Sequence, residues 1–184
     1  RTAGDQEGAL DVLYELEVAH RVVSVKAHGL AYEPFAGAKE RGPDFAVTFN
    51  GRAWFLLEVT RLGAQTPATT QRIARAVTLK LKQLRAEGPN VVLVGVGGGG
   101  PDEQELALAL VSIARDAETA DDSFFSRLGM RDRKAFFQYY ERLAAVMVRT
   151  GSVPGAAVTS WFNPRARRQV ETRGLQALLG ALAE

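Results

Sequence analysis

The sequence predicts an α/β fold in which helices cover both faces of a mixed central β-sheet. Two apolar runs flank Asn50-Gly51, which is the strongest short-range signal for a β-hairpin. The run NVVLVGV, residues 90–96, is continuously apolar, as expected of a strand buried on both faces. Segments with apolar residues at helical spacing alternate with these strands, which favours a layered α/β arrangement.

The first expected element is a helix from residue 6 to about 28, capped by Asp5 and ended by Gly29. Its apolar residues recur at helical spacing: Ala9, Val12, Leu13, Leu16, Ala19 and Val23. The other expected elements, in chain order, are a strand at 30–35, a hairpin at 43–60, a helix at 70–86, a strand at 90–96, helices at 102–117 and 120–140, strands at 143–149 and 156–162, and a helix at 166–182.

We expect these elements to form one domain of residues 1–184, because this length suits a single hydrophobic core. Its central part would be residues 6–96, and residues 143–182 would complete the sheet. Hydrophobic residues make up 46% and charged residues 24% of the chain, which are ordinary values for globular proteins.

Composition excludes several kinds of site. The chain has no cysteine, which rules out disulfides, thiolate metal sites and a cysteine nucleophile, and fits the cytoplasmic location that we expect. Its two histidines are too few for a histidine-rich zinc site. No apolar run approaches the ~20 residues that span a bilayer, and no signal peptide is evident, so we expect no membrane partner.

The register of the hairpin follows from its hydrophobic pattern. A two-residue turn at Asn50-Gly51 would place the apolar residues of the two strands on opposite faces. A slip of one residue, pairing Phe49 with Ala53, gathers them on one face. We therefore predict a three-residue loop with a bulge at Gly51.

The same register places Asp44 directly opposite Glu58. Two carboxylates in that position repel each other and destabilise the strand pair. A bound divalent cation removes the repulsion, and carboxylate oxygens are natural ligands of Mg²⁺. The alternative is that Pro43-Asp44 starts a turn and that Glu58 ends an exposed strand.

Lys80 lies within the apolar stripe of the helix expected at 70–86, whereas Lys82 points to the opposite side. A lysine inside such a stripe must extend to solvent, pair with an acid or serve a function. The hairpin acids are the expected partner, and extension to solvent at the edge of the helix is the alternative.

The segment from Val59 to Ala86 contains no acidic residue and six basic ones. A basic segment beside the acids is suited to binding phosphates. We expect contacts to nucleic acid from Arg72, Arg75 and Lys82. The alternative is that this is simply a solvated helix face.

Pro43-Asp44, thirteen intervening residues and Glu58-Val59-Thr60 resemble the motif of the PD-(D/E)XK nuclease superfamily, which has a restriction-endonuclease-like core. The resemblance extends over about residues 6–96 and includes the order helix, strand, acidic hairpin, helix, strand. It implies that Asp44, Glu58 and the Val59 carbonyl hold Mg²⁺ or Mn²⁺ for hydrolysis of a phosphodiester bond. DNA is the expected substrate, and RNA stays open.

The family usually carries a lysine where this chain has Thr60. Some members place that lysine on the following helix, as Lys80 is placed here, and it would position the attacking water. The first helix would add an acid, for which Glu15 is preferred and Glu17 is the alternative. Thr60 leaves open an inactive relative that binds nucleic acid or protein, and the acids could also be coincidental in an unrelated fold. Cutting two strands often takes two copies, so the resemblance also suggests a homodimer.

Overall fold

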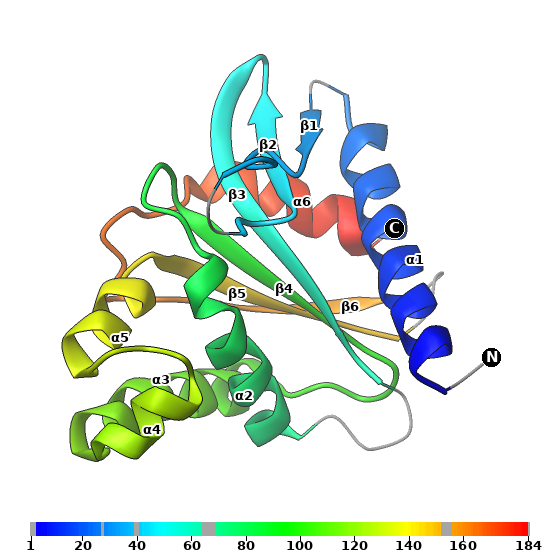
Figure 1. Ribbon diagram of the computed structural model, residues 1–184. Helices are drawn as coiled ribbons and strands as arrows, with labels where there is room; N and C mark the ends of the chain where they lie inside the picture. Colours follow the sequence, from blue (N-terminus) through cyan, green and yellow to red (C-terminus); the bar gives the residue numbers. More distant parts are fainter. Residues whose placement is uncertain (1–2, 27, 39–40, 64–68, 152–155, 184) are drawn as a thin grey trace.

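The computed structural model describes residues 3–26, 28–38, 41–63, 69–151 and 156–183. Its centre is a six-stranded sheet whose strands follow one another in chain order (Figure 1). The inner pairs β3–β4 and β4–β5 are parallel and the other pairs are antiparallel, so the predicted mixed sheet is confirmed. The strands are β1 (His28–Tyr32), β2 (Phe45–Phe49), β3 (Arg52–Leu62), β4 (Asn90–Val96), β5 (Leu143–Thr150) and β6 (Ala157–Phe162).

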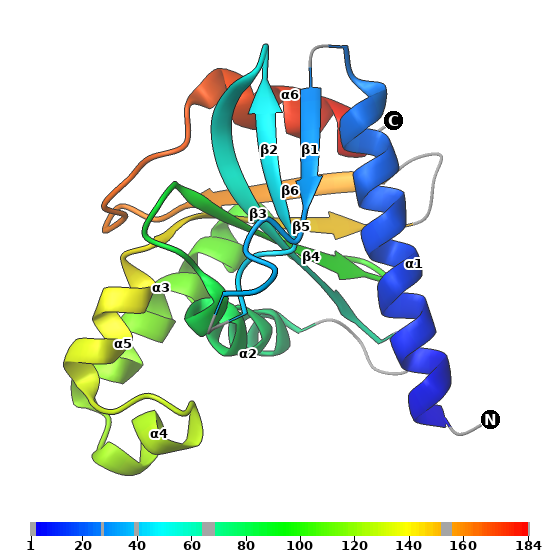
Figure 2. The same ribbon diagram turned by 45° about the horizontal axis from the view of Figure 1, so that its top comes forward.

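Helices cover both faces of this sheet, as the predicted α/β class requires (Figures 1 and 2). One face packs against α1 (Ala3–Ser24) and α6 (Thr172–Ala183). The other face packs against α2 (Thr70–Lys80), α3 (Glu103–Thr119) and α5 (Arg133–Tyr140). A 3-10 turn, η1 (Leu81–Gln83), continues α2, and the short helix α4 (Asp122–Arg127) joins the second layer. No helix in the described ranges is long and apolar enough to cross a bilayer.

Strand β4 lies between the two cores and is buried along its whole length. Because side chains alternate along a strand, Val92 and Val94 enter the core beneath α2 and α3, whereas Val91 and Leu93 enter the core beneath α1 and α6. This explains why the segment is continuously apolar, and the predicted strand has the bounds that the structure shows.

Four predicted helices were too long, and the one predicted at 120–140 is in fact two short helices, α4 and α5. Helix α1 ends at Ser24 rather than His28, and β1 begins where that helix was expected to end. The predicted helix at 70–86 ends with η1, because the Asn90 carboxamide hydrogen-bonds both the N–H and the carbonyl of Arg85 and holds a loop there. Helix α6 begins at Thr172 rather than at residue 166.

The turn of the hairpin differs from its prediction. Phe49 pairs with Arg52 across a two-residue turn in which Asn50 and Gly51 both have positive φ, the conformation that Asn-Gly favours. The one-residue slip occurs further along as a bulge, after which Val47 pairs with Phe55 as predicted. The prediction of a bulge at Gly51 was therefore wrong. The local preference of Asn-Gly fixes the turn, and the hydrophobic pattern fixes the strand register only beyond the turn.

The extra residue at the bulge is Trp54, which has no partner in the register. Trp54 and the next residue, Phe55, therefore both face the core beneath α1 and α6, although consecutive strand residues normally alternate. The indole stacks on Phe49 with ring centroids 4.5 Å apart, and it lies against Gly174 of α6. The bulge thus lets Trp54 pack the hairpin against α6.

The side chain of Tyr14 of α1 lies directly against Gly95 of β4. A Cβ atom at this position would lie 2.4 Å from Cζ of Tyr14, which is closer than real contacts allow. Only glycine therefore leaves room at this position for the Tyr14 ring.

We expect Gly95→Ala to lower the free energy of unfolding by about 1–3 kcal/mol, because the added methyl group overpacks the contact with Tyr14. Urea denaturation measures this change. Gly98→Ala is the matched control, since nothing lies within 4 Å of a Cβ there, and its effect should be close to zero. Equal effects of the two substitutions would show that the close contact between Gly95 and Tyr14 does not contribute to stability.

Candidate functional site

The site begins where the backbone pairing of β2 with β3 stops, at Phe45 and Leu57. The next residue, Asp44, continues the interaction with its side chain: Oδ2 accepts a hydrogen bond from the N–H of Val59 at 2.8 Å. Asp44 is only 4% exposed, so this bond satisfies a backbone donor that would otherwise be buried without a partner. The carboxylate is thereby held against the edge of β3.

Glu58 lies between Leu57 and Val59, which both point into the core beneath α1 and α6. Alternation therefore turns Glu58 to the opposite face, beneath α2, where it is completely buried. Its Oε1 accepts a hydrogen bond from Nζ of Lys80 at 2.6 Å. The predicted orientation of Lys80 toward the acids is therefore what the structure shows, while Lys82 is exposed, as expected.

Gln83 of η1 lies beside the same carboxylate. In one orientation of its amide, the oxygen accepts a hydrogen bond from Lys80 Nζ at 3.4 Å. In the flipped orientation, its nitrogen donates to Oε2 of Glu58 at 3.1 Å, which suits an acceptor-only carboxylate better. The end of α2 and the turn that follows it thus supply two polar side chains to one buried acid.

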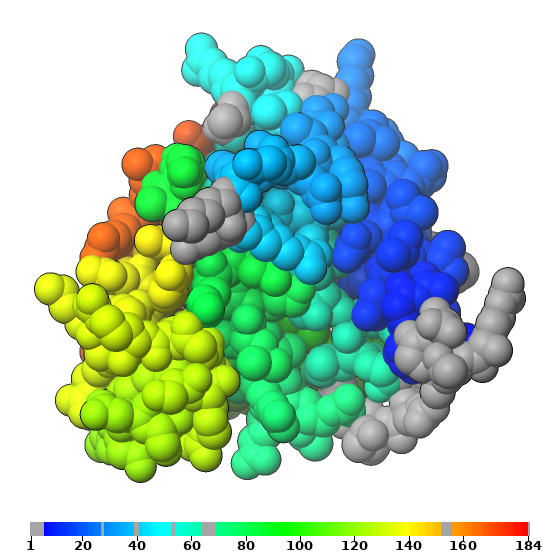
Figure 3. All heavy atoms as spheres, in the orientation of Figure 1, coloured from blue at the N-terminus to red at the C-terminus, as the bar shows by residue number. Residues whose placement is uncertain are grey.

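A pocket of about 240 Å³ opens between α1, the chain before β2 and α2. Its lining includes Glu15, Arg41, Val59, Thr60 and Lys80. Figure 3 shows these three parts of the chain meeting on one side of the molecule, with α1 in blue, the chain before β2 in light blue and α2 in green. The pocket therefore brings together segments that are far apart in the sequence.

Arg41 was not predicted from the sequence. Its guanidinium is 66% exposed at the mouth of the pocket, and Nη2 lies 3.7 Å from Oδ1 of Asp44. It stands in a connecting loop, where no periodicity shows which way a side chain points, so only its proximity to Pro43-Asp44 could have drawn attention to it.

The structure distinguishes the two candidate acids of the first helix. Glu15 lines the pocket. Glu17 instead accepts hydrogen bonds from Arg149 at 2.8 Å and from Arg21 at 3.2 Å. Successive helix residues point about 100° apart, so these two acids, two positions apart, face different neighbours.

The residues that we expect to contact nucleic acid do not line this pocket. Arg75 lines a separate groove of about 840 Å³ between α2, α3 and α4. The Lys82 ammonium lies near Gly129, in the loop between α4 and α5. Arg72 is half-buried near the start of α2. A ligand would have to extend across α2 to contact these residues and the acids together.

The three carboxyl groups share an environment that disfavours their negative charge. The pKa of Glu58 is raised to about 7, mainly by burial and also by the charge of Asp44, against the opposing effect of Lys80. Burial also raises the pKa of Asp44, although the Val59 N–H and Lys80 oppose this shift. Partial burial, followed by the charge of Asp44, raises the pKa of Glu15. Burial therefore disfavours ionisation of all three carboxyl groups, although Lys80 and Arg41 lie nearby.

Within the described residues, no group of three or more His, Cys, Asp or Glu side chains is arranged to hold a metal ion. Any metal site here must accordingly draw on two carboxylates together with backbone oxygen and water. Comparisons with protein-family models, curated proteins and solved structures found no match.

The raised pKa of Glu58 has a measurable consequence. Between its ordinary value of 4.5 and about 7, the folded protein keeps a proton that the unfolded chain releases. Stability should therefore fall as the pH rises through this window, by up to about 3 kcal/mol. We expect Glu58→Gln to remove this fall, as measured by urea denaturation at a series of pH values without divalent cations.

The control for this experiment is Glu87→Gln, because Glu87 is exposed. It should leave the pH dependence of wild type in place. A Glu58→Gln variant whose stability followed wild type throughout pH 4–8 would show that burial does not perturb this carboxyl.

Proposed function

We propose that this chain has a restriction-endonuclease-like core and is a metal-dependent phosphodiesterase of the PD-(D/E)XK type, acting on DNA. The observation that carries the proposal is the convergence of Asp44, Glu58 and Lys80: Asp44 accepts a hydrogen bond from Val59 beside Glu58, Lys80 pairs with Glu58, and Lys80 also lines the pocket that Glu15 lines. Buried acids with raised pKa values beside a lysine in a cleft are typical of functional sites.

Mg²⁺ or Mn²⁺ would be held by Asp44, Glu58 and the carbonyl of Val59. The Val59 N–H points toward Asp44, and the N–H and carbonyl of one strand residue point to the same side of the strand. The carbonyl of Val59 is therefore directed to the same edge. Mg²⁺ commonly takes only one or two carboxylates and keeps several waters, which fits this set of donors.

When bound, the metal would supply an activated water and stabilise charge on the phosphate. Lys80, held by Glu58, would donate a hydrogen bond that orients this water. It would thus replace the lysine that the family usually carries at the position of Thr60. Glu15, on the opposite wall, would hold further water molecules, and Arg41 stands at the mouth where a phosphate would enter.

An inactive domain that binds nucleic acid or protein is the second candidate, and one observation favours it. Lys80 already pairs with Glu58, and Asp44 already accepts a hydrogen bond from Val59, so both acids have partners without a metal. In such a domain the same residues would only join α2 and the chain before β2 to the edge of β3.

The decisive experiment measures divalent-cation binding by calorimetry and cleavage of plasmid DNA with Mg²⁺ or Mn²⁺, with RNA as a second substrate. We expect Asp44→Asn to lose both metal binding and cleavage, because the change removes the charge but retains an acceptor for Val59. Lys80→Ala should lower the cleavage rate by ~100-fold or more and leave metal binding intact, since lysine is not a Mg²⁺ ligand.

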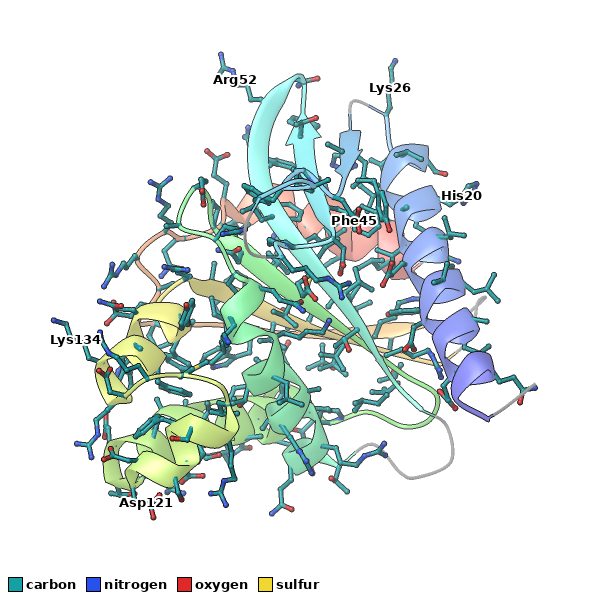
Figure 4. All side chains as sticks on the ribbon, in the orientation of Figure 1. His20, Lys26, Phe45, Arg52, Asp121 and Lys134 are labelled. Carbon is teal, nitrogen blue, oxygen red and sulfur yellow. The ribbon has the colours of Figure 1, made fainter. Side chains whose placement is uncertain are left out.

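Two further variants control this experiment. Lys80→Gln keeps a hydrogen-bond donor for Glu58, which separates lost chemistry from lost folding. Lys134→Ala removes an exposed lysine of α5, a helix that contributes no residue to the pocket and that lies across the molecule from α1 in Figure 4, and should behave as wild type. If wild type bound no divalent cation and the variants changed only the melting temperature, the inactive domain would be the correct reading.

Binding of DNA across α2 would involve Arg72, Arg75 and Lys82. Replacing any one of them by alanine should reduce the slope of log affinity against log salt by about one unit, since each phosphate contact releases counterions. Fluorescence anisotropy without divalent cations measures this slope, and Lys134→Ala again serves as the control. Unchanged slopes for all three variants would mean that this face is only solvated.

A further inference from the structure

A groove of about 840 Å³ lies between α2, α3 and α4, apart from the acids of the candidate site. Its volume is within the range of ~300–1,000 Å³ that is typical of small-molecule sites. Figure 1 shows these three helices together on the side of the sheet away from α1 and α6. We call it the α2–α3 groove, and no step of the proposed hydrolysis uses its interior.

Small side chains leave this groove open. Ala74 lines it from α2, and Ala109 and Ser112 line it from α3. Protein interiors are normally packed without such gaps, so small residues on two neighbouring helices leave a hollow that larger ones would fill. Leu79 and Leu108 line the same groove and are 57% and 66% exposed, so apolar surface remains uncovered there within the described part of the chain.

The hydroxyl groups in the lining are already satisfied by their own helices. Thr78 Oγ1 donates a hydrogen bond to the carbonyl of Ala74 at 2.8 Å, and Ser112 Oγ donates one to the carbonyl of Ala109 at 2.8 Å. These two residues therefore present mainly their carbon atoms to the groove. A polar ligand would give up hydrogen bonds to water here without replacing them, whereas an apolar one would lose none.

The charges at the margin of the groove favour an anionic ligand. Arg75 of α2 and Arg127 of α4 line it and are exposed, and neither forms a hydrogen bond or ion pair with another described residue. The two acids of the lining do have contacts within the chain. Glu105 accepts a hydrogen bond from the backbone at the start of α3, and Asp116 lies 3.7 Å from Arg115. The charges left for a ligand are therefore positive.

We propose that the α2–α3 groove binds a free single-chain amphiphile with an anionic head, such as a medium-chain fatty acid. The chain would lie along the apolar floor, and the carboxylate would meet Arg75 and Arg127. The lining residues of α3 extend from Glu105 to Asp116, which is about 16 Å at 1.5 Å per residue. Extended chains advance roughly 1.2 Å per bond, so about twelve carbons match this length.

The shape of the groove favours one small molecule over a membrane surface or a partner helix. Phe124 and Leu128 of α4 line it together with Ile113, which is only 6% exposed. The apolar floor is thus recessed among three helices, where a flat bilayer surface does not reach. A partner helix of about 16 Å would have only about three turns, and would bury less than the roughly 800 Å² per partner of a standard interface.

The proposal goes beyond the proposed hydrolysis and is independent of it, because none of Asp44, Glu58 and Lys80 lines the groove. Arg75 is common to the groove and to the face that we expect to contact DNA. Binding of the amphiphile is therefore measured without nucleic acid and without divalent cations, so that it succeeds or fails separately from cleavage.

Isothermal titration calorimetry with dodecanoate, the twelve-carbon fatty acid, tests the site. We expect saturable binding of one molecule per chain, with a dissociation constant on the order of 100 µM. Decanoate, which is two methylene groups shorter, should bind about tenfold more weakly, because each buried methylene contributes to affinity.

Two sets of variants locate the ligand. Ala109→Leu fills the groove and should abolish binding, whereas Val111→Phe adds apolar volume to α3 outside the lining and should bind as wild type. The double variant Arg75→Gln/Arg127→Gln should weaken binding of dodecanoate by about tenfold or more and leave binding of the uncharged decanol unchanged. Lys134→Gln on α5 is its control, and circular dichroism checks that each variant is folded.

Three results would overturn the proposal. The first is the absence of saturable binding of dodecanoate up to ~1 mM, or binding by Ala109→Leu equal to that of wild type. The second is decanol binding as tightly as decanoate, which would show that the two arginines take no part. The third is binding to phosphatidylglycerol vesicles without binding of free dodecanoate, which would identify a membrane surface as the ligand.

Discussion

The buried ion pair between Glu58 and Lys80 is the contact on which the site depends. A carboxylate without exposed surface costs several kcal/mol unless a cation compensates it, and Lys80 does so at 2.6 Å. The pair also positions α2, whose buried residues Ile73 and Val77 reach the same core as β4. The apolar contacts hold the helix on the sheet, and the ion pair selects which helix residue meets Glu58. Packing and chemistry are therefore determined together.

The site also depends on where β2 ends. Because the backbone ladder stops at Phe45, the edge of β3 beyond Leu57 meets side chains in place of another strand. The Asp44 side chain accepts a hydrogen bond from Val59 at the start of this edge. Further along, Arg61 forms ion pairs with Glu7 and Asp11 of α1. An open sheet edge is normally a liability, and here it is covered by groups that also form a pocket.

The grouping of three acids around Lys80 works against stability. The pKa values of Glu15, Asp44 and Glu58 are all raised, so each ionised group costs free energy where it stands. A fold selected for stability alone would place apolar residues there, because replacing buried ion pairs by well-packed hydrophobic groups is often neutral or favourable. Retaining the acids is consistent with a ligand that compensates their charge. Helix α1 shows a similar conflict on its outer face, where apolar surface remains in water.

The sequence by itself determined the features that depend on local patterns: the hairpin at Asn50-Gly51, the central strand at 90–96 and the inward direction of Lys80. Only the tertiary structure decided the place of the bulge, the choice between Glu15 and Glu17, and the position of Arg41. It also decided which face of α1 is buried. Periodicity shows that a helix has an apolar face, but α1 has two. The surface it packs against, with Gly95 leaving room for Tyr14, determines which of them enters the core.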